Sequence, residues 1–156
     1  MNDLSAESRV WIFQTDKVFE AHEREEIQQL MARFVAEWTA HDQSLNAASG
    51  VYHDRFLVFM VDEQLIGASG CSLDKLTHFV QSLDQKFGMD SFNRMQFAWI
   101  DKDQVKVADA QAFKEMYASG IIDNDTKVFD HLVSSKSAFE QSWIKPLSES
   151  WHRRFV

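Results

Sequence analysis

Cysteine, proline and glycine are scarce in this sequence, which has one, one and five of them among 156 residues. The lone thiol, Cys71, excludes an internal disulfide and a multi-thiolate zinc or iron–sulfur site. So few prolines and glycines argue against long flexible linkers. We therefore expect a single domain that spans residues 1–156.

Targeting and membrane signals are also lacking. Residues 1–5 show no basic-then-apolar run typical of a secretory signal, and no apolar stretch approaches the roughly 20 residues that cross a bilayer. Sixteen basic residues stand against 24 acidic ones, a formal net charge of −8. The missing signals lead us to expect a cytoplasmic protein that does not insert into membranes. Because an acidic domain repels phosphate backbones, we also expect that it does not bind nucleic acid.

Large aromatic side chains are abundant, with thirteen Phe, five Trp and two Tyr, and they suffice for a buried core. Residue patterns predict strands at 9–15, 51–61, 65–68, 95–100, 105–108 and 127–132. They predict helices at 17–40, at 73–87 with Gly88 as a left-handed cap, and at 109–120, with a loop at 41–50. Since short hairpins force antiparallel neighbours, we predict an α+β fold: a single mixed or antiparallel sheet with amphipathic helices packed on it.

The C-terminal tail, about residues 135–156, is polar but carries large rings at Trp143, Trp151 and Phe155. Isolated rings in such a tail dock on their own domain or pack against a second subunit. The tail therefore predicts intramolecular docking, with a homodimer contact as the alternative.

The loop before the second predicted helix gives the candidate site. Ser69, Gly70, Cys71 and Ser72 lie where free backbone N–H groups attract an anion and lower the pKa of a thiol. We expect them to hold a small-molecule anion, with Ser69, Gly70 and Ser72 as ligand-binding residues and Cys71 as the candidate catalytic thiol. The structural alternative is that Ser72 is an N-cap, Gly70 a turn residue and Cys71 a small buried hydrophobe.

No catalytic motif accompanies this loop. It matches neither the phosphate-binding G-x-x-x-x-G-K-[ST] nor a G-x-S-x-G elbow. His78 lies two helical turns from Cys71, about 10 Å along the axis, too far for a nucleophile–base hydrogen bond. Arg94 is a further anion partner if its hairpin lies beside the loop. The sequence thus leaves open whether the protein is an enzyme, and it implies no cofactor.

Metal binding has little support in the sequence. Asp16, Asp62 and Asp101 each follow a predicted strand directly, and parallel strands would gather them at one edge as ligands for Mg²⁺. Asp is also a favoured residue in turns and caps, which accounts for all three positions. We therefore predict no metal site.

Three blocks of the sequence, 34–41, 68–74 and 92–94, resemble those of a small family of uncharacterised bacterial proteins of the Bacteroidetes type, which are often labelled "ABC transporter ATPase". The likeness covers most of the chain. The label implies a Walker lysine and aspartate, whereas this sequence has no G-K-[ST] anywhere. The resemblance therefore implies no ATPase activity and no catalytic residue.

Residues 61–68 and 112–121 are similar in rhythm to GCN5-type N-acetyltransferases. That family grips coenzyme A pyrophosphate with a basic, glycine-rich loop, and this sequence has Ala68-Ser69-Gly70-Cys71-Ser72 there, with one glycine and no arginine. Three functions stay open: binding of a small ligand or anion at this loop, a non-enzymatic interaction protein acting through a homodimer or tail surface, and a divergent acetyltransferase.

Overall fold

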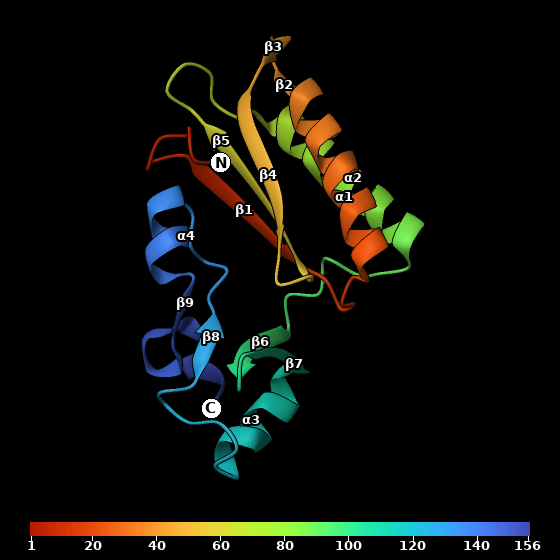
Figure 1. The fold of residues 1–156 in the computed structure, drawn as a ribbon. Helices are drawn as coiled ribbons and strands as arrows, with labels where there is room; N and C mark the ends of the chain where they lie inside the picture. Colours follow the sequence, from red (N-terminus) through yellow and green to blue (C-terminus); the bar gives the residue numbers. More distant parts are fainter. The chain divides into compact units, whose positions relative to one another are not determined.

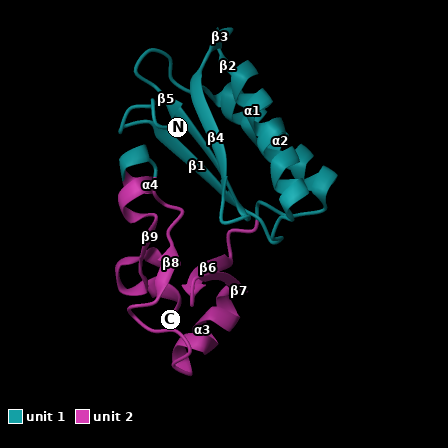
Figure 2. Cartoon of the chain, in the orientation of Figure 1, with its two compact units in different colours: residues 1–92, 134–137 teal, residues 93–133, 138–156 magenta.

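The computed structural model describes all residues 1–156 and confirms the α+β class. The chain forms two compact units, shown in Figure 2. Unit 1 comprises residues 1–92 and 134–137, and unit 2 comprises residues 93–133 and 138–156. No helix is both long enough and apolar enough to span a bilayer.

Unit 1 is a three-stranded antiparallel sheet with two helices on one face (Figure 1). Its elements are β1 Arg9–Gln14, α1 Ala21–Glu37, the short hairpin β2 Thr39–Ala40 and β3 Gln43–Ser44, β4 Asn46–Tyr52, β5 Phe56–Asp62 and α2 Gly70–Phe87. The strand order is β1-β5-β4, so β1 and β4 run parallel with β5 between them. This is the split β-α-β arrangement.

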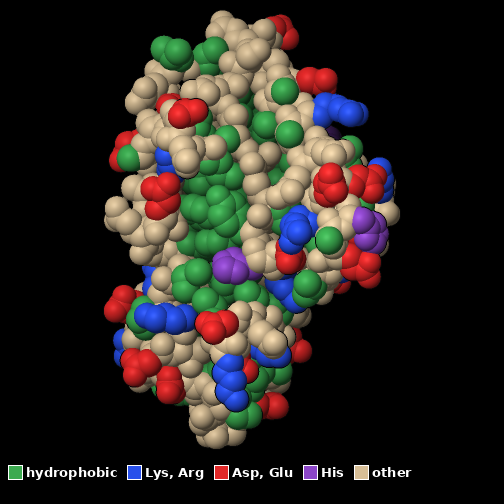
Figure 3. Space-filling view, viewed as in Figure 1, with side chains coloured by type: hydrophobic (Ala, Val, Ile, Leu, Met, Phe, Trp, Pro, Cys, Tyr) green, Lys and Arg blue, Asp and Glu red, His purple; other side chains and the backbone are tan.

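Alternation along β5 sends one set of side chains to each face of this sheet. Leu57, Phe59 and Val61 pack against α1 and α2, where the rings of Phe34 and Phe79 stack at 4.4 Å. The intervening residues of β5 point to the other face, and Figure 3 shows hydrophobic side chains gathered over the sheet. The sheet of unit 1 is therefore apolar on both faces.

Unit 2 is built on a four-stranded antiparallel sheet with the order β7-β6-β8-β9. Its elements are β6 Gln96–Asp101, β7 Gln104–Asp109, α3 Ala110–Ala118, β8 Lys127–Phe129, α4 Lys136–Ser142 (whose first residues belong to unit 1), β9 Ile144–Pro146 and the 3-10 helices η1 Leu147–Glu149 and η2 Trp151–Phe155. Its core contains Phe97, Trp99 and Phe113, against which Trp151 and Phe155 of the tail pack.

Several predicted elements are confirmed in position. The helix expected at 73–87 is α2, and Gly88 ends it at φ +61°. Asp109 caps α3 by accepting from Ala112 N, and the predicted hairpin is β6–β7.

Three predictions around β4 and β5 are wrong. The expected loop 41–50 contains β3 and most of β4, and the expected strand 51–61 is broken by a turn at His53 and Asp54. Both turn residues have positive φ without being glycine, so the residue that usually marks such a turn is missing from the sequence. The return strand at 65–68 is a loop in which Leu65 is 94% exposed, because β5 already has strands on both sides.

Candidate functional site

The predicted site at the start of α2 is a helix cap. Ser69 Oγ accepts from Ser72 N at 3.2 Å, and Ser72 Oγ accepts from Ser69 N at 2.7 Å. Ser72 Oγ also donates to Ser69 O at 2.8 Å. The two hydroxyls that the sequence suggested for a ligand thus satisfy the first turn of the helix.

Cys71 lies in this first turn with its side chain exposed, so its interpretation as a small buried hydrophobe is wrong. Ser72 is fully buried, and its carbonyl accepts from Trp38 Nε1 at 2.9 Å. Arg94 belongs to unit 2, where it is exposed just before β6. An anion or thiol-dependent site at Ser69, Gly70, Cys71 and Ser72 stays a prediction.

The three carboxylates after the predicted strands do not gather. Because β1 and β5 are antiparallel, Asp16 and Asp62 follow strand ends at opposite ends of the sheet. Asp62 accepts from Ser5 N and Gln64 N, as a turn residue does. Asp101 lies in the other unit, and no group of three or more His, Cys, Asp or Glu side chains is placed to hold a metal ion.

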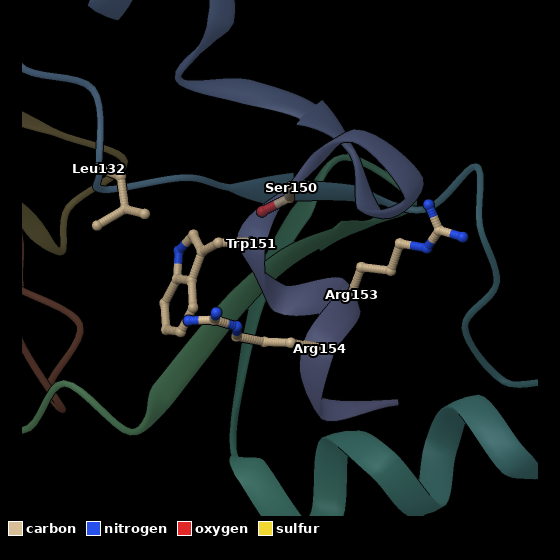
Figure 4. A pocket seen from close by; sticks show the side chains of 5 residues that line it. All are labelled: Leu132, Ser150, Trp151, Arg153 and Arg154. Atoms are coloured by element: carbon tan, nitrogen blue, oxygen red, sulfur yellow. The ribbon is translucent and has the colours of Figure 1, made fainter.

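A second site lies in unit 2, at η2. A solvent-open pocket of about 580 Å³ is lined by Leu132, Ser150, Trp151, Arg153 and Arg154. Figure 4 shows that Arg154 extends toward the Trp151 indole, whereas Arg153 projects from the other side of η2. Leu132, which follows β8, faces the edge of the indole that carries its nitrogen.

The polar groups of this pocket are poorly satisfied. Arg153 and Arg154 are exposed, and their guanidinium groups make no ion pair or hydrogen bond with the rest of the chain. Trp151 Nε1 is buried and has no hydrogen-bond partner, a condition that costs about 1–3 kcal/mol for a buried donor. The pocket therefore offers the guanidinium group of Arg154, which has no anionic partner in the chain, beside an apolar ring.

A buried polar network supports η2 from beneath. Lys145 Nζ pairs with Asp130 Oδ2 at 3.3 Å, and Ser150 Oγ donates to the same oxygen at 3.4 Å. Ser150 Oγ also lies 2.7 Å from His152 Nδ1. These bonds hold the first residues of η2 in place. They therefore set the backbone positions from which the side chains of Arg153 and Arg154 project.

Burial keeps two histidines of this network neutral. Burial lowers the pKa of His152 to about 4. Burial is also the main cause that lowers the pKa of His131 to about 4, and His152 in its protonated form lowers it further. Trp143 Nε1 donates to His131 Nδ1 at 3.1 Å, which requires that nitrogen to be unprotonated.

The contact between Ser150 and His152 does not form a catalytic dyad. Asp130 is bonded to the serine, and no carboxylate orients the imidazole. Both side chains are at least nine-tenths buried, which also keeps a substrate from the hydroxyl. The contact between Ser150 and His152 therefore joins two buried side chains inside unit 2.

Sequence reasoning missed this pocket. From its rings, the run Trp151-His152-Arg153-Arg154-Phe155 predicts a segment that docks on the domain or contacts a second subunit, and no ligand site. Its signal was an adjacent pair of arginines beside tryptophan in an acidic chain, but whether an arginine has a carboxylate partner depends on the fold.

Comparisons with family models, curated proteins and solved structures gave no match to this chain. The functional interpretation therefore depends on the contacts of the site.

Proposed function

We propose that this chain is a binding protein for a small organic anion, a carboxylate or phosphate that carries a flat apolar group, and that the ligand occupies the pocket at η2. One observation carries the proposal: the guanidinium group of Arg154, which has no ion pair, lies beside the Trp151 indole in a pocket that Arg153 also lines, in a chain whose net charge is −8.

The charge balance supports an anion. With 24 acidic residues available, several exposed cations of the chain have acquired carboxylate partners, as in the pairs Lys86–Glu26 and Arg24–Asp54. Arg153 and Arg154 have acquired none. Arginine binds carboxylate and phosphate through paired, charge-assisted hydrogen bonds, so an anion from outside the chain is the natural partner.

The remaining walls support an apolar part next to the anionic group. Trp151 offers an aromatic surface and Leu132 is 69% exposed at the pocket. Pockets of a few hundred Å³ that combine aromatic walls with a few polar groups are typical of small-molecule sites. A ligand with a ring and a carboxylate or phosphate group fits both kinds of wall.

An interaction protein that acts through apolar tail residues is less favoured. Trp143 is only 4% exposed, and Trp151 and Phe155 pack against Phe97. The large rings of the tail thus pack mostly inside unit 2, and the exposed groups that remain for binding a partner are its arginines.

The test is a titration followed by the indole N–H signal of Trp151 in a ¹⁵N correlation spectrum. The probes are benzoate, phenyl phosphate and inorganic phosphate, with benzamide as the neutral counterpart of benzoate. We expect saturable shifts of the Trp151 signal with benzoate and phenyl phosphate, weaker ones with inorganic phosphate and none with benzamide.

Variants assign the binding to the pocket. Arg154→Ala is expected to weaken benzoate or phenyl phosphate about tenfold, which corresponds to about 1.4 kcal/mol. Arg94→Ala removes an exposed arginine elsewhere in unit 2 and should leave the affinity unchanged. Equal weakening by both variants, or equal shifts with benzamide, would refute the proposal.

A further inference from the structure

The indole nitrogen of Trp151 stands out among the groups that line the pocket at η2. It is one of two buried side-chain nitrogen or oxygen atoms in the chain that have no hydrogen-bond partner. Two other indole nitrogens do have one: Trp38 Nε1 donates to Ser72 O at 2.9 Å, and Trp143 Nε1 donates to His131 Nδ1 at 3.1 Å. Because buried donors in folded proteins are nearly always paired, the Trp151 N–H calls for an acceptor from outside the chain.

The ring that carries this nitrogen is held in place, whereas the side chain that faces it is not. The Trp151 ring packs edge-on against Phe97 and Phe155, with ring centroids 5.4 and 5.3 Å away. Leu132 faces the edge of the indole that carries the nitrogen (Figure 4), and it is anchored only at its backbone, where Leu132 N donates to Asp130 Oδ1 at 3.0 Å. Since the Leu132 side chain is largely exposed, it can change rotamer at little cost.

The indole nitrogen and the Arg154 guanidinium lie at different ends of the same ring. In Figure 4 the guanidinium lies beside the six-membered part of the indole, whereas the nitrogen belongs to the five-membered part and points toward Leu132. A ligand that uses both groups therefore needs two separate polar ends joined by an apolar spacer. The end at Trp151 suits an uncharged acceptor, because a second anion would lose its water there without gaining a countercharge.

We propose that Trp151 Nε1 selects aromatic acids that carry a neutral acceptor, such as a ketone or amide carbonyl, at the end of the ring opposite the acid group. This inference rests on the proposed function, since the acid group binds Arg154 as described above. The carbonyl accepts from Trp151 Nε1 once Leu132 changes rotamer. The ligand thereby satisfies a buried donor that the chain leaves unpaired, which favours it over a ligand of the same shape without the carbonyl.

Two probes of nearly the same shape test the selection. 4-Acetylbenzoate has a carbonyl oxygen where 4-isopropenylbenzoate has a CH₂ group, and both are ionised at neutral pH. Titrations followed by the Trp151 indole N–H signal give the two dissociation constants. We expect 4-acetylbenzoate to bind about fivefold more tightly. We also expect it to move the indole proton downfield and to slow the exchange of this proton with water, and 4-isopropenylbenzoate to do neither.

Two variants assign the preference to the indole nitrogen. Trp151→Phe keeps an aromatic wall but removes the N–H, so calorimetry should give the same affinity for both probes. Arg154→Ala is the matched counterpart: it removes the cation and keeps the N–H, so it should weaken both probes by the same factor and leave the fivefold preference unchanged. If Trp151→Phe does not fold, the two probes and the indole proton in the natural chain decide the question.

The outcomes separate this inference from the proposed function. Equal affinity of the natural chain for the two probes, or a preference that persists in a folded Trp151→Phe chain, would overturn the role of the indole nitrogen and leave the anion site standing. If neither probe binds, the proposed function is refuted and this inference with it.

Discussion

The start of α2 and the pocket at η2 both carry polar side chains, and they differ in what their polar atoms already bind. At α2 the hydroxyls of Ser69 and Ser72 bond each other's backbone. At η2 the guanidinium groups of Arg153 and Arg154 bind nothing in the chain. Residue type suggested the first site, whereas the absence of partners favours the second.

The supporting layers of the two regions differ in the same way. α2 is a long helix anchored by Leu76, Val80 and Leu83 in the core of unit 1. η2 is five residues long and depends on buried polar contacts with Asp130. α2 can lose one polar contact of its cap and still be held by its buried apolar side chains. At η2, loss of Lys145 leaves the buried carboxylate of Asp130 without its charged partner.

The largest effect is expected from the ion pair beneath η2. Lys145→Met removes the cation and leaves the carboxylate of Asp130, which is 5% exposed, without its charged partner. We expect the free energy of unfolding to fall by about 3 kcal/mol, and urea denaturation measures it. Lys86→Met, which removes the exposed partner of Glu26, is the control and should cost about 0.5 kcal/mol. Equal losses would show that Asp130 is effectively solvated.

Acid should act on the same region next. His131 and His152 have a pKa of about 4 in the folded protein against 6.5 in the unfolded chain. Between about pH 6.5 and pH 4 the unfolded chain therefore takes up protons that the folded one does not, and stability falls as the pH falls. Below about pH 4 both states are protonated and this contribution no longer changes.

Each histidine contributes at most about 3 kcal/mol to this loss. Urea denaturation at several pH values in this window measures the slope. His152→Asn should remove part of it, and His22→Asn, which replaces an exposed histidine of unit 1, should remove none. A stability that does not change between pH 6.5 and pH 4.5 would contradict the buried, neutral state of both rings.

Some elements of the fold were predictable from the sequence and others were not. α2, the β6–β7 hairpin and α3 were predictable because their apolar spacing and their caps, Gly88 and Asp109, agree. β4 was not, because Asn-Ala-Ala-Ser-Gly-Val-Tyr has no alternation of apolar and polar residues. Its strand character comes from pairing with β5, which is a tertiary effect.

The candidate site shows the same limit. The sequence identified the loop at the start of α2 and its two serines, but the hydrogen bonds that occupy those serines follow from backbone geometry. At η2 the residues were visible, whereas their lack of carboxylate partners was not. Whether a side chain has a hydrogen-bond or ion-pair partner depends on the folded chain. Sequence patterns predict such a partner only where it lies nearby in the sequence.

A further variant tests whether Ser69 caps α2 or belongs to a ligand site. Ser69→Ala removes the side chain that accepts from Ser72 N and should lower the free energy of unfolding by about 1 kcal/mol, while Ser69→Thr should retain most of it. Benzoate shifts at Trp151 should be the same in both variants. If Ser69→Ala is as stable as the natural chain but abolishes the shifts, Ser69 would belong to a ligand site rather than to the cap.

The smallest expected effect compares two turns, one in which the aspartate side chain has a partner and one in which it has none. His53-Asp54 and Lys102-Asp103 both adopt positive φ at two successive residues, a geometry that favours glycine. Asp54 accepts from Arg24 Nη1 at 2.6 Å, whereas the Asp103 side chain binds nothing in the chain. Asp103→Gly should therefore stabilise the protein by about 0.5 kcal/mol. Asp54→Gly gains the same backbone relief but loses an ion pair of similar worth, so its stability should not change. Thermal unfolding of both variants measures the difference, and an equal gain in both would mean that the pair between Arg24 and Asp54 contributes nothing.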